Sequence, residues 1–331
     1  MTPGSPDDDG APAVRRRVLV LLNPHAGRRR SLTRAQARLR THPGLALDLA
    51  VPDPADHAAQ LAAARTALAD GVDAVVVRGG DGMVAAGVGL VCDHAEATGR
   101  RVPLGIVPAG TGNDLARAAG LHRRDPGAAL EAVLRALEDP AAPVRRIDAL
   151  RLTVTRAGAV VERRWAANSV NIGFDARVNA RANALGAVPG PLRYLAALGL
   201  EARAFAAVEM GLGLDDGPVR RERVALVSVQ NGPTIGGGIP LAPGARLDDG
   251  RAEATVVGPL PTAGLALLFP LVYVRAHRLL RPLCTERARR VRVAVPDGVP
   301  VYADGDEVLP ASHGGAAMEV EAVPGAVALL G

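Results

Sequence analysis

The sequence contains no lysine, because all 39 basic residues among its 331 are arginine. Schiff-base catalysis through a lysine amine is therefore excluded. A phosphate-binding P-loop of the Gly-Lys-Ser/Thr kind is excluded as well, since its lysine contacts the β- and γ-phosphates. The abundance of arginine and alanine is typical of a GC-rich genome rather than of one particular function.

Aromatic residues and cysteines are also scarce. Phe, Trp and Tyr make up 2% of the chain, so the cores have to be built from Leu, Val and Ala. The short arginine runs have no aromatic residues among them on which bases could stack, and we expect no nucleic-acid partner. The two cysteines, Cys92 and Cys284, offer neither a disulfide framework nor a metal-ligand spacing, which predicts a reducing compartment such as the cytoplasm.

No apolar run is long enough to cross a bilayer. The longest, Leu265–Val274, contains Pro270 and falls far short of the roughly 20 residues that a spanning helix needs. Residues Met1–Ala13 are rich in Pro, Gly and Asp and have no apolar core, which predicts a disordered tail rather than a signal peptide. The net charge of +5 favours anionic partners. We therefore expect a cytoplasmic protein that binds a polyphosphate ligand or attaches peripherally to the anionic inner face of the membrane.

The length predicts about two domains, and the residue pattern changes near Arg146. Before it, apolar runs alternate with helical segments, which predicts βαβ units and a parallel sheet. After it, short β-branched segments bounded by turns predict an antiparallel sandwich. We expect a tail over 1–13, an α/β domain over 14–146, and a sandwich domain over 147–331 whose last residues return to the first domain.

The expected elements follow from the same patterns. In the first domain the strands are 18–22, 45–51, 74–77 and 104–107. In the second domain the strands are 149–155, 160–165, 223–229, 252–257, 291–295 and 318–322, and two apolar helices are expected at 192–207 and 262–280. The second of these helices has basic residues near its end and fits an anionic membrane interface.

Three glycine-rich loops follow strands of the expected parallel sheet. They are Asn23–Gly27, Gly79–Met83 and Pro108–Asp114. Ligands of open α/β sheets bind at the carboxyl ends of the strands, and exposed backbone amides at helix N-termini favour phosphate. The sequence therefore predicts a phosphate-binding edge. A degenerate dinucleotide fingerprint from Gly80 to Ala85 follows the third strand and has no acidic residue about 20 positions on, which disfavours a nicotinamide dehydrogenase.

An ordered set of motifs extends from residue 16 to 325. It consists of Asn23-Pro24-x-x-Gly27, Gly79-Gly80-Asp81-Gly82, Pro108-x-Gly110-Thr111-x-Asn113-Asp114-Leu115-Ala116-Arg117, Ile147-Asp148, Asn168-x-x-x-Ile172-Gly173-Phe174-Asp175-Ala176-x-Val178, Asn231-Gly232, Gly236-Gly237-Gly238, Pro243-x-Ala245-x-x-Asp248-Asp249-Gly250 and Asp304-Gly305-Asp306. The Gly-Gly-Asp-Gly loop by itself is shared with NAD kinases and phosphofructokinases. The whole set resembles the diacylglycerol kinase catalytic-domain superfamily, the bacterial lipid kinases related to diacylglycerol, sphingosine and ceramide kinases.

The resemblance implies a fold and an activity. It implies an N-terminal α/β lobe with a parallel sheet of the NAD kinase and diacylglycerol kinase type, which binds the nucleotide, and a C-terminal antiparallel β-sandwich lobe for the lipid substrate. ATP would bind in the cleft between them, and its γ-phosphoryl group would pass to a lipid hydroxyl such as that of a diacylglycerol or a sphingoid-like lipid. Mg²⁺ would be required. A homodimer is compatible with the sequence.

Residue roles come from the same resemblance. The residues implied to bind the nucleotide and its metal are Asn23, Gly79, Gly80, Asp81, Gly82, Met83, Gly110, Thr111, Asn113 and Asp114. Asp81, Asp114 and Asp148 match acids of the magnesium and active-site network, and carboxylates suit this hard cation. For Asp114 a helix N-cap is the structural alternative.

Two Asp-containing turns match further sites of the family. Asp249, with the main-chain oxygens of Arg246 and Arg251, matches the site of a separate structural Mg²⁺, although a plain Asp-Asp-Gly hairpin would have the same sequence. Asp304-Gly305-Asp306 matches the Asp-Gly-Glu turn that holds the general base, whose carboxylate takes the proton of the lipid hydroxyl. Asp306 replaces the usual Glu, and Glu307 follows, so the base remains open among Asp304, Asp306 and Glu307.

Two further departures concern the nucleotide site. Met83 stands where the family usually has threonine, and Val51 occupies a position that is often threonine. Two other functions therefore stay open, a small-molecule kinase of the NAD kinase type and a catalytically degenerate protein that binds lipid or nucleotide. No short motif specifies the acceptor lipid.

Overall fold

The computed structural model describes residues 14–27, 29–41, 45–51, 53, 56–122, 124–139, 141–185, 196–197, 200–201, 207–261, 264, 271–272, 276 and 283–331. The expected tail 1–13 lies outside this range, and so does most of each expected helix, 192–207 and 262–280. None of the helices in the described ranges combines the length and the apolar character needed to cross a membrane.

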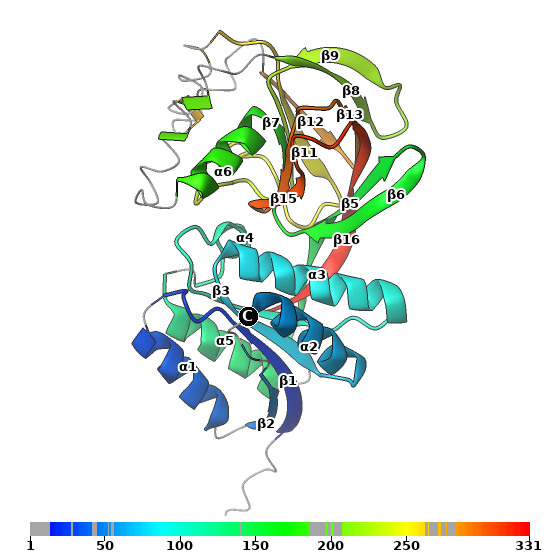
Figure 1. The fold of residues 1–331 in the computed structure, drawn as a ribbon. Coiled ribbons are helices and arrows are strands. Elements are labelled where there is room, and N and C mark those ends of the chain that lie inside the picture. Colours follow the sequence, from blue (N-terminus) through cyan, green and yellow to red (C-terminus); the bar gives the residue numbers. More distant parts are fainter. Residues whose placement is uncertain are drawn as a thin grey trace, which may run out of the picture.

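The N-terminal lobe is a parallel sheet covered by helices on both faces (Figure 1). Its strands lie in the order β2, β1, β3, β4, and α2 and α3 cover one face while α1 and α5 cover the other. The bounds are β1 Val14–Leu22, β2 Leu45–Ala50, β3 Ala74–Gly79, β4 Leu104–Pro108, α1 Arg29–Arg40, α2 His57–Ala69, α3 Asp81–Thr98, α4 Asp114–Ala118 and α5 Pro126–Glu138. The sheet is almost wholly apolar, as expected for strands covered on both faces.

Local signals set the ends of these helices. The Asp56 carboxylate accepts the amides of Ala58 and Ala59 at the start of α2, and Asp125 does the same for α5, where Pro126 is the first helical residue. The longest of the described helices, α3, ends at Gly99 in the left-handed conformation (φ 71°). Asp caps, proline in the first turn and glycine after the last are the residues that satisfy helix ends.

The sheet of the first lobe continues into the second lobe. In the described part of the chain it has ten strands, because the long strand β16 (Ala316–Leu330) pairs in parallel with β4 at one end and antiparallel with β13 at the other. Figure 1 shows β16 running from the upper lobe down to the C-terminus in the lower one. The remaining strands of this sheet are β5 Arg145–Arg156, β6 Ala159–Ala166, β8 Val208–Leu214, β9 Arg220–Val224 and β13 Arg290–Val295.

A second sheet packs on the upper part of the first and completes a β-sandwich. Its six described strands lie in the order β12, β11, β10, β7, β14, β15 and pair antiparallel. Their bounds are β7 Ser169–Gly173, β10 Leu226–Gln230, β11 Ala252–Val257, β12 Leu283–Ala288, β14 Val301–Ala303 and β15 Asp306–Leu309, and α6 spans Phe174–Ala184. Buried Val, Leu and Ala side chains fill the space between the sheets.

The fold class predicted from the sequence is confirmed, and the differences lie in the second lobe. One expected strand, 223–229, is two strands of different sheets, β9 and β10, which meet at Ala225. Strand periodicity continues across such a crossing, so the pattern does not locate it. Strand β8 contains Gly211 and Gly213, which weaken its sequence signal. The neighbouring strand leaves little room for a side chain at the first of them, since a Cβ at Gly211 would lie 3.0 Å from the Cβ of Ala294.

Candidate active site

The three glycine-rich loops meet at one edge of the parallel sheet. The amide of Asn23 donates to the carbonyl of Arg78 (3.0 Å), and that of Ala109 donates to the carbonyl of Gly79 (2.8 Å). The loop after β3 therefore has the other two loops as its neighbours. The Asn23 side chain caps its own turn by accepting the amide of His25 (2.9 Å).

Close approach of the loops requires glycine at two positions. A Cβ on Gly110 would lie 2.5 Å from the Cα of Gly80, and a Cβ on Gly79 would lie 2.6 Å from the Cβ of Met83. No side chain fits at either distance. The absence of side chains allows the backbones of the two loops to approach each other closely at this edge.

The N-terminus of α3 lies at the centre of this edge. Gly80 is the N-cap residue and provides no capping side chain, so the first-turn amides at Gly82 and Met83 have no acceptor within the helix. The Met83 side chain is buried in the core between the sheet and α2 and α3. Its side chain therefore serves packing, in the core and against Gly79.

Asp81 ties two of the loops together. One carboxylate oxygen accepts the amide of Asn113 (2.8 Å), and the other accepts that of Asp114 (2.7 Å). Burial raises the pKa of Asp81, and the nearby charge of Asp114 raises it further, against the lowering effect of these amide hydrogen bonds.

Asn113 and Thr111 complete the third loop. Asn113 has a left-handed backbone (φ 52°). Its side-chain amide makes reciprocal hydrogen bonds with Gly110, accepting from the backbone N–H (3.1 Å) and donating to the carbonyl (2.8 Å). Thr111, at the tip of the turn, is exposed. The Asn113 side chain thus stabilises the loop, while Thr111 is accessible to a ligand.

Asp114 joins the two lobes. Its carboxylate accepts from Arg117 Nη1 within α4, and it also accepts from the Thr234 hydroxyl and the Gly237 amide of the second lobe, each at 2.7 Å. Arg117 donates in addition to the carbonyls of Gly112 and Gly237. The alternative that Asp114 is an N-cap is wrong, because α4 begins at Asp114 and its N-cap residue is Asn113.

Asp304 of the second lobe is linked to Asp114 through Asn168 and Thr234. It follows β14 with a left-handed backbone (φ 49°), and its carboxylate accepts the amides of Ala167 (2.6 Å), Asn168 (2.9 Å) and Ser169 (2.9 Å). Burial raises the pKa of Asp304 to about 6 in spite of these bonds, and the charge of Asp81 contributes to the rise. The charge of Asp81 in the first lobe therefore affects the pKa of Asp304 in the second.

The two other candidates for the base point elsewhere. Asp306 and Glu307 are exposed on β15, and Glu307 accepts from the Tyr302 hydroxyl (3.2 Å). Of the three carboxylates that the sequence left open, Asp304 is connected by hydrogen bonds through Asn168 and Thr234 to Asp114 of the first lobe.

Asp148 has a different environment from the other acids. Its two carboxylate oxygens accept the amides of Gly250 (2.7 Å) and Gly325 (2.8 Å), and its own amide donates to the carbonyl of Leu247 (2.6 Å). These contacts make Asp148 a residue that holds the loop before β11 and the bulge of β16. The predicted catalytic role of Asp148 has no support in this geometry.

The expected structural metal site does not fit the residues present. Asp249 accepts the amide of Arg251 (3.0 Å) with one oxygen and forms an ion pair with Arg287 through the other. The Arg246 guanidinium donates from Nη2 to Oδ1 of Asp248 (3.3 Å). Both oxygens of Asp249 thus have partners already. Among the described residues no group of three acidic, histidine or cysteine side chains is placed to hold a metal ion, here or near Asp81, so a cation would also need main-chain or ligand oxygens.

Several residues near these loops and acids were given no role by the sequence analysis. Arg78 is fully buried and donates to the carbonyl of Ala26 (3.2 Å), which fixes the first loop. Asn168 donates through its side chain to the carbonyl of Thr234 (2.8 Å). Asn168, Arg117 and Gly237 belong to the motifs above, so their presence was visible in the sequence, while their contacts across the lobes were not.

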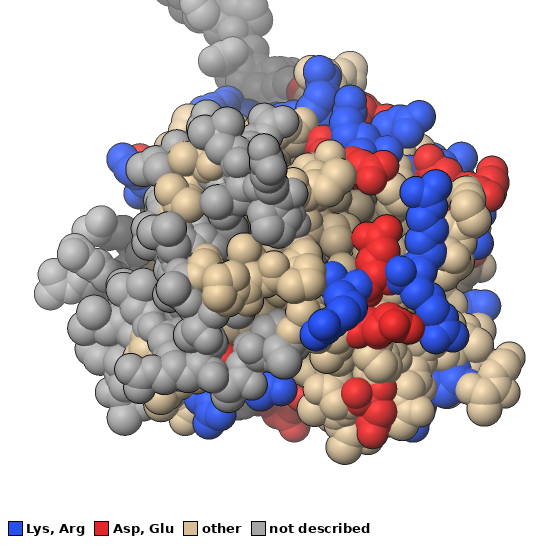
Figure 2. All heavy atoms as spheres, turned by 90° about the horizontal axis from the view of Figure 1, so that it is seen from above, with Lys and Arg blue, Asp and Glu red and all other residues tan. Residues whose placement is uncertain are grey.

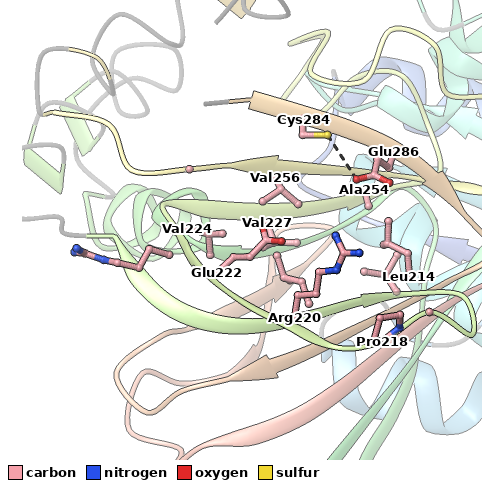
Figure 3. A pocket seen from close by; sticks show the side chains of 15 residues that line it. Leu214, Pro218, Arg220, Glu222, Val224, Val227, Ala254, Val256, Cys284 and Glu286 are labelled. Carbon is pink, nitrogen blue, oxygen red and sulfur yellow. Dashed lines mark hydrogen bonds between the residues drawn. The ribbon is translucent and has the colours of Figure 1, made fainter. Parts of the chain in front are cut away.

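A separate cavity of about 460 Å³ opens between the two sheets at the edge formed by β9 and β12 (Figure 3). Apolar side chains such as Val224, Val227 and Val256 line it. It lies toward the Leu226 end of β10, whereas Asp304 bonds to Ser169, which pairs with the other end at Gln230. The cavity is therefore not part of the candidate active site.

Comparison with known proteins agrees with the fold and identifies the family. Residues 17–145 match the family model of the diacylglycerol kinase catalytic domain, and residues 168–331 match that of the YegS C-terminal NAD kinase beta sandwich-like domain. A diacylglycerol kinase of Mycobacterium tuberculosis is 34% identical over 95% of this chain and 94% of its own length. A probable lipid kinase YegS-like of Stenotrophomonas maltophilia is 31% identical over 79% of each chain.

Solved structures show the same architecture. A diacylglycerol kinase from Bacillus anthracis has a TM-score of 0.62 at 20% identity, over 95% of this chain and 96% of that one. A yeast NADH kinase in complex with NADH has a TM-score of 0.54 at 11% identity, over 95% and 82%. The fold is thus that of the two-lobed kinases of the NAD kinase type. Within that class, the chain belongs to the diacylglycerol kinase catalytic-domain superfamily and is a phosphotransferase of the lipid kinase group.

Proposed function

We propose that this protein transfers the γ-phosphoryl group of ATP to the hydroxyl of a lipid, with Mg²⁺ and with Asp304 as the base. The single observation that carries the proposal is the series of hydrogen bonds that links Asp304 through Asn168 and Thr234 to Asp114. It brings an acid of the second lobe to the loops that would hold the phosphates. Transfer to a hydroxyl needs a phosphate cradle, compensation of charge and a base, and these loops together with Asp304 would supply all three.

The phosphates would be held without lysine. The first-turn amides of α3 at Gly82 and Met83 and the Thr111 hydroxyl are the donors available, and the partial positive charge of a helix N-terminus adds to them. Because backbone amides do this work, replacement of the family's threonine by Met83 leaves the cradle intact. Asn23 closes the edge on the side of the first loop.

The acids of the cleft fit a cation. Asp81 lies within electrostatic reach of both Asp114 and Asp304, and its charge helps raise the pKa of Asp304. A cation would relieve this repulsion, and Asp81 is the residue that would hold it together with the nucleotide phosphates. When bound, Mg²⁺ would offset the negative charge of the phosphates during transfer.

Asp304 has the properties of a base near neutral pH. With a pKa of about 6 it is ionised at pH 7 to 8, and it can take the proton as the lipid oxygen bonds to the γ-phosphorus and the bond to ADP breaks. The amides of residues 167–169 hold its carboxylate in place, so little reorganisation is required when the proton arrives.

A diacylglycerol is the acceptor we propose first, because the relative from Mycobacterium tuberculosis that matches nearly the whole chain is named a diacylglycerol kinase. The expected membrane contact and homodimer stay predictions. The basic residues near the end of the second apolar helix lie outside the described residues. In Figure 2 the described part of the face seen from above carries arginine and acidic side chains intermixed, without a patch of one sign.

The test is the transfer of labelled γ-phosphate from ATP to a total lipid extract and, in parallel, to purified diacylglycerol and NAD. Wild type is compared with Asp304→Asn and with the matched control Asp306→Asn. We expect Asp304→Asn to lose at least about 100-fold, the lower end of what a positioned base contributes, and Asp306→Asn to keep most of the activity. Thermal unfolding of each variant verifies that it is folded.

Three results would contradict parts of the proposal. Preferred phosphorylation of NAD would identify a small-molecule kinase. ATP binding without turnover on any lipid would identify a degenerate binding protein. A 100-fold loss in Asp306→Asn but not in Asp304→Asn would move the base to β15.

A further inference from the structure

The loop before β11 carries a negative charge that needs a positive partner. Asp249 lies two residues before Arg251, whose amide holds one of its oxygens (3.0 Å). In the resemblance stated above, the carboxylate at this position holds a divalent metal ion. Here its second oxygen is in an ion pair with the guanidinium of Arg287.

Strand pairing places Arg287 at this position. Arg287 lies on β12 directly opposite Glu253 of β11 in the antiparallel register. Its Nε lies 3.3 Å from Glu253 Oε1, and Glu253 is almost fully buried. The planar guanidinium therefore bridges two carboxylates, a geometry that suits its forked donors and that an ammonium group would not reproduce.

The bridged loop also crosses the boundary between the lobes. Leu247 is buried in the core of the first lobe, and the Gly250 amide donates to Asp148 on β5. Arg145 of β5 approaches Asp248 as well (3.8 Å). A cation at Asp249 thus holds in place a loop whose other contacts fix the entry of the chain into the second lobe.

We propose that Arg287 is a built-in cation that takes the place of a divalent metal at Asp249, so that this loop is metal-independent. An arginine is protonated at every pH at which the protein is folded, and it is attached to the neighbouring strand. A divalent ion at the same oxygen would have to displace it or tolerate its positive charge at contact distance. This inference does not rest on the proposed function.

The experiment measures the thermal unfolding midpoint of the full chain, without nucleotide or lipid, in EDTA and in Mg²⁺. For each protein we take the change in the unfolding midpoint that Mg²⁺ causes. The same change, measured in the corresponding Asp249→Asn variant, is then subtracted, which removes the effect of Mg²⁺ bound elsewhere. For wild type against Asp249→Asn we expect no difference. For Arg287→Met against Arg287→Met/Asp249→Asn we expect a difference of at least about 2 °C, because removal of the guanidinium takes the positive charge away from Asp249.

Either of two results would overturn the proposal. One is a difference of about 2 °C or more in wild type, which would place Mg²⁺ at Asp249 beside Arg287. The other is no difference in the Arg287→Met pair. If Arg287→Met does not fold, Arg287→Gln takes its place, because it also removes the charge but keeps a polar group. Arg221→Met, in an exposed pair with Glu209, is the control for loss of a surface arginine.

Discussion

At the scale of single residues, Asp304 combines two opposing influences. Three backbone amides donate to its carboxylate, which favours the charged form, while burial and the charge of Asp81 favour the neutral one. Burial has the larger effect, so the pKa rises from its ordinary value of about 4 to about 6. A raised acid pKa means that the base is lost by protonation in a pH range where most carboxylates are still ionised.

The first prediction concerns pH. We expect kcat/KM for the lipid to fall about tenfold per pH unit below pH 6, because Asp304 takes up a proton there and can no longer accept one. Initial rates between pH 5 and 8 test this, with the unfolding midpoint followed over the same range. A rate that is flat down to pH 5 would argue against Asp304 as the base. Asp306→Asn should leave the profile unchanged.

The second prediction concerns Gly110. A methyl group in Gly110→Ala meets the Gly80 backbone at 2.5 Å, which cannot move without separating the two loops. We expect a loss of about 1–3 kcal/mol of stability and a loss of ATP binding, measured by thermal unfolding and by calorimetric titration. Unchanged ATP affinity would contradict the assignment of this edge to the phosphates.

Gly89→Ala provides the matched control. Gly89 lies within α3, and nothing is within 4 Å of the position its Cβ would take. Alanine is the better helix former, so this substitution should stabilise the protein by about 0.5–1 kcal/mol and leave ATP binding as it is.

At the scale of elements, contact between α4 and the loop after β10 sets the relation of the lobes. The carboxylate of Asp114 is the common acceptor for Arg117, Thr234 and Gly237. Gly236, Gly237 and Gly238 all have positive φ values, and a Cβ on Gly238 would lie 2.5 Å from Arg117 Nη1. Glycine is favoured in this loop because all three residues have left-handed backbones, and Gly238 lies against the Arg117 guanidinium.

The third prediction tests this contact with a substitution that preserves shape. Thr234→Val removes the hydroxyl that donates to Asp114, and we expect a loss of about 1–3 kcal/mol of stability and at least a fivefold fall in kcat through displacement of Asp114 and the neighbouring loop. Thr255→Val is the control, because the Thr255 hydroxyl bonds to that of Thr285 within the second sheet. It should lower stability and spare kcat. Equal effects of the two variants on kcat would contradict a positioning role for Thr234.

At the scale of the whole molecule, the two lobes share one sheet and part of one core. Strand β16 belongs to both, and the core of the first lobe includes Leu247 and Trp165 from beyond β5. Arg151 of β5 adds an ion pair with Glu96 of α3 and lies 6.0 Å from the centre of the Trp165 ring. An unfolded second lobe would leave the first with an open core.

The fourth prediction follows from this continuity. We expect one cooperative unfolding transition rather than two, with coincident midpoints by far-ultraviolet circular dichroism and by the fluorescence of Trp165, the single tryptophan of the chain. Two separated transitions would show that the lobes fold independently. ATP should raise the common midpoint, since a ligand that binds only the folded state stabilises it.

The sequence by itself determined the class of this protein and the makeup of its phosphate edge. The alternation of strands and helices predicts the parallel sheet, and the ordered glycine motifs predict loops that must be free of side chains, as Gly79 and Gly110 are. These features are local, because each depends on a few consecutive residues and on backbone conformations that the residue types themselves favour.

Only the tertiary structure decided what each acid does. Asp81, Asp114, Asp148 and Asp304 look alike in the sequence, yet one ties two loops, one joins the lobes, one holds a turn and one faces the cleft. Arg287 and Asp249 are 38 residues apart and meet through the register of β11 and β12. Such contacts arise from the packing of distant segments, so the burial and charge that set a carboxylate's chemistry are absent from any local pattern.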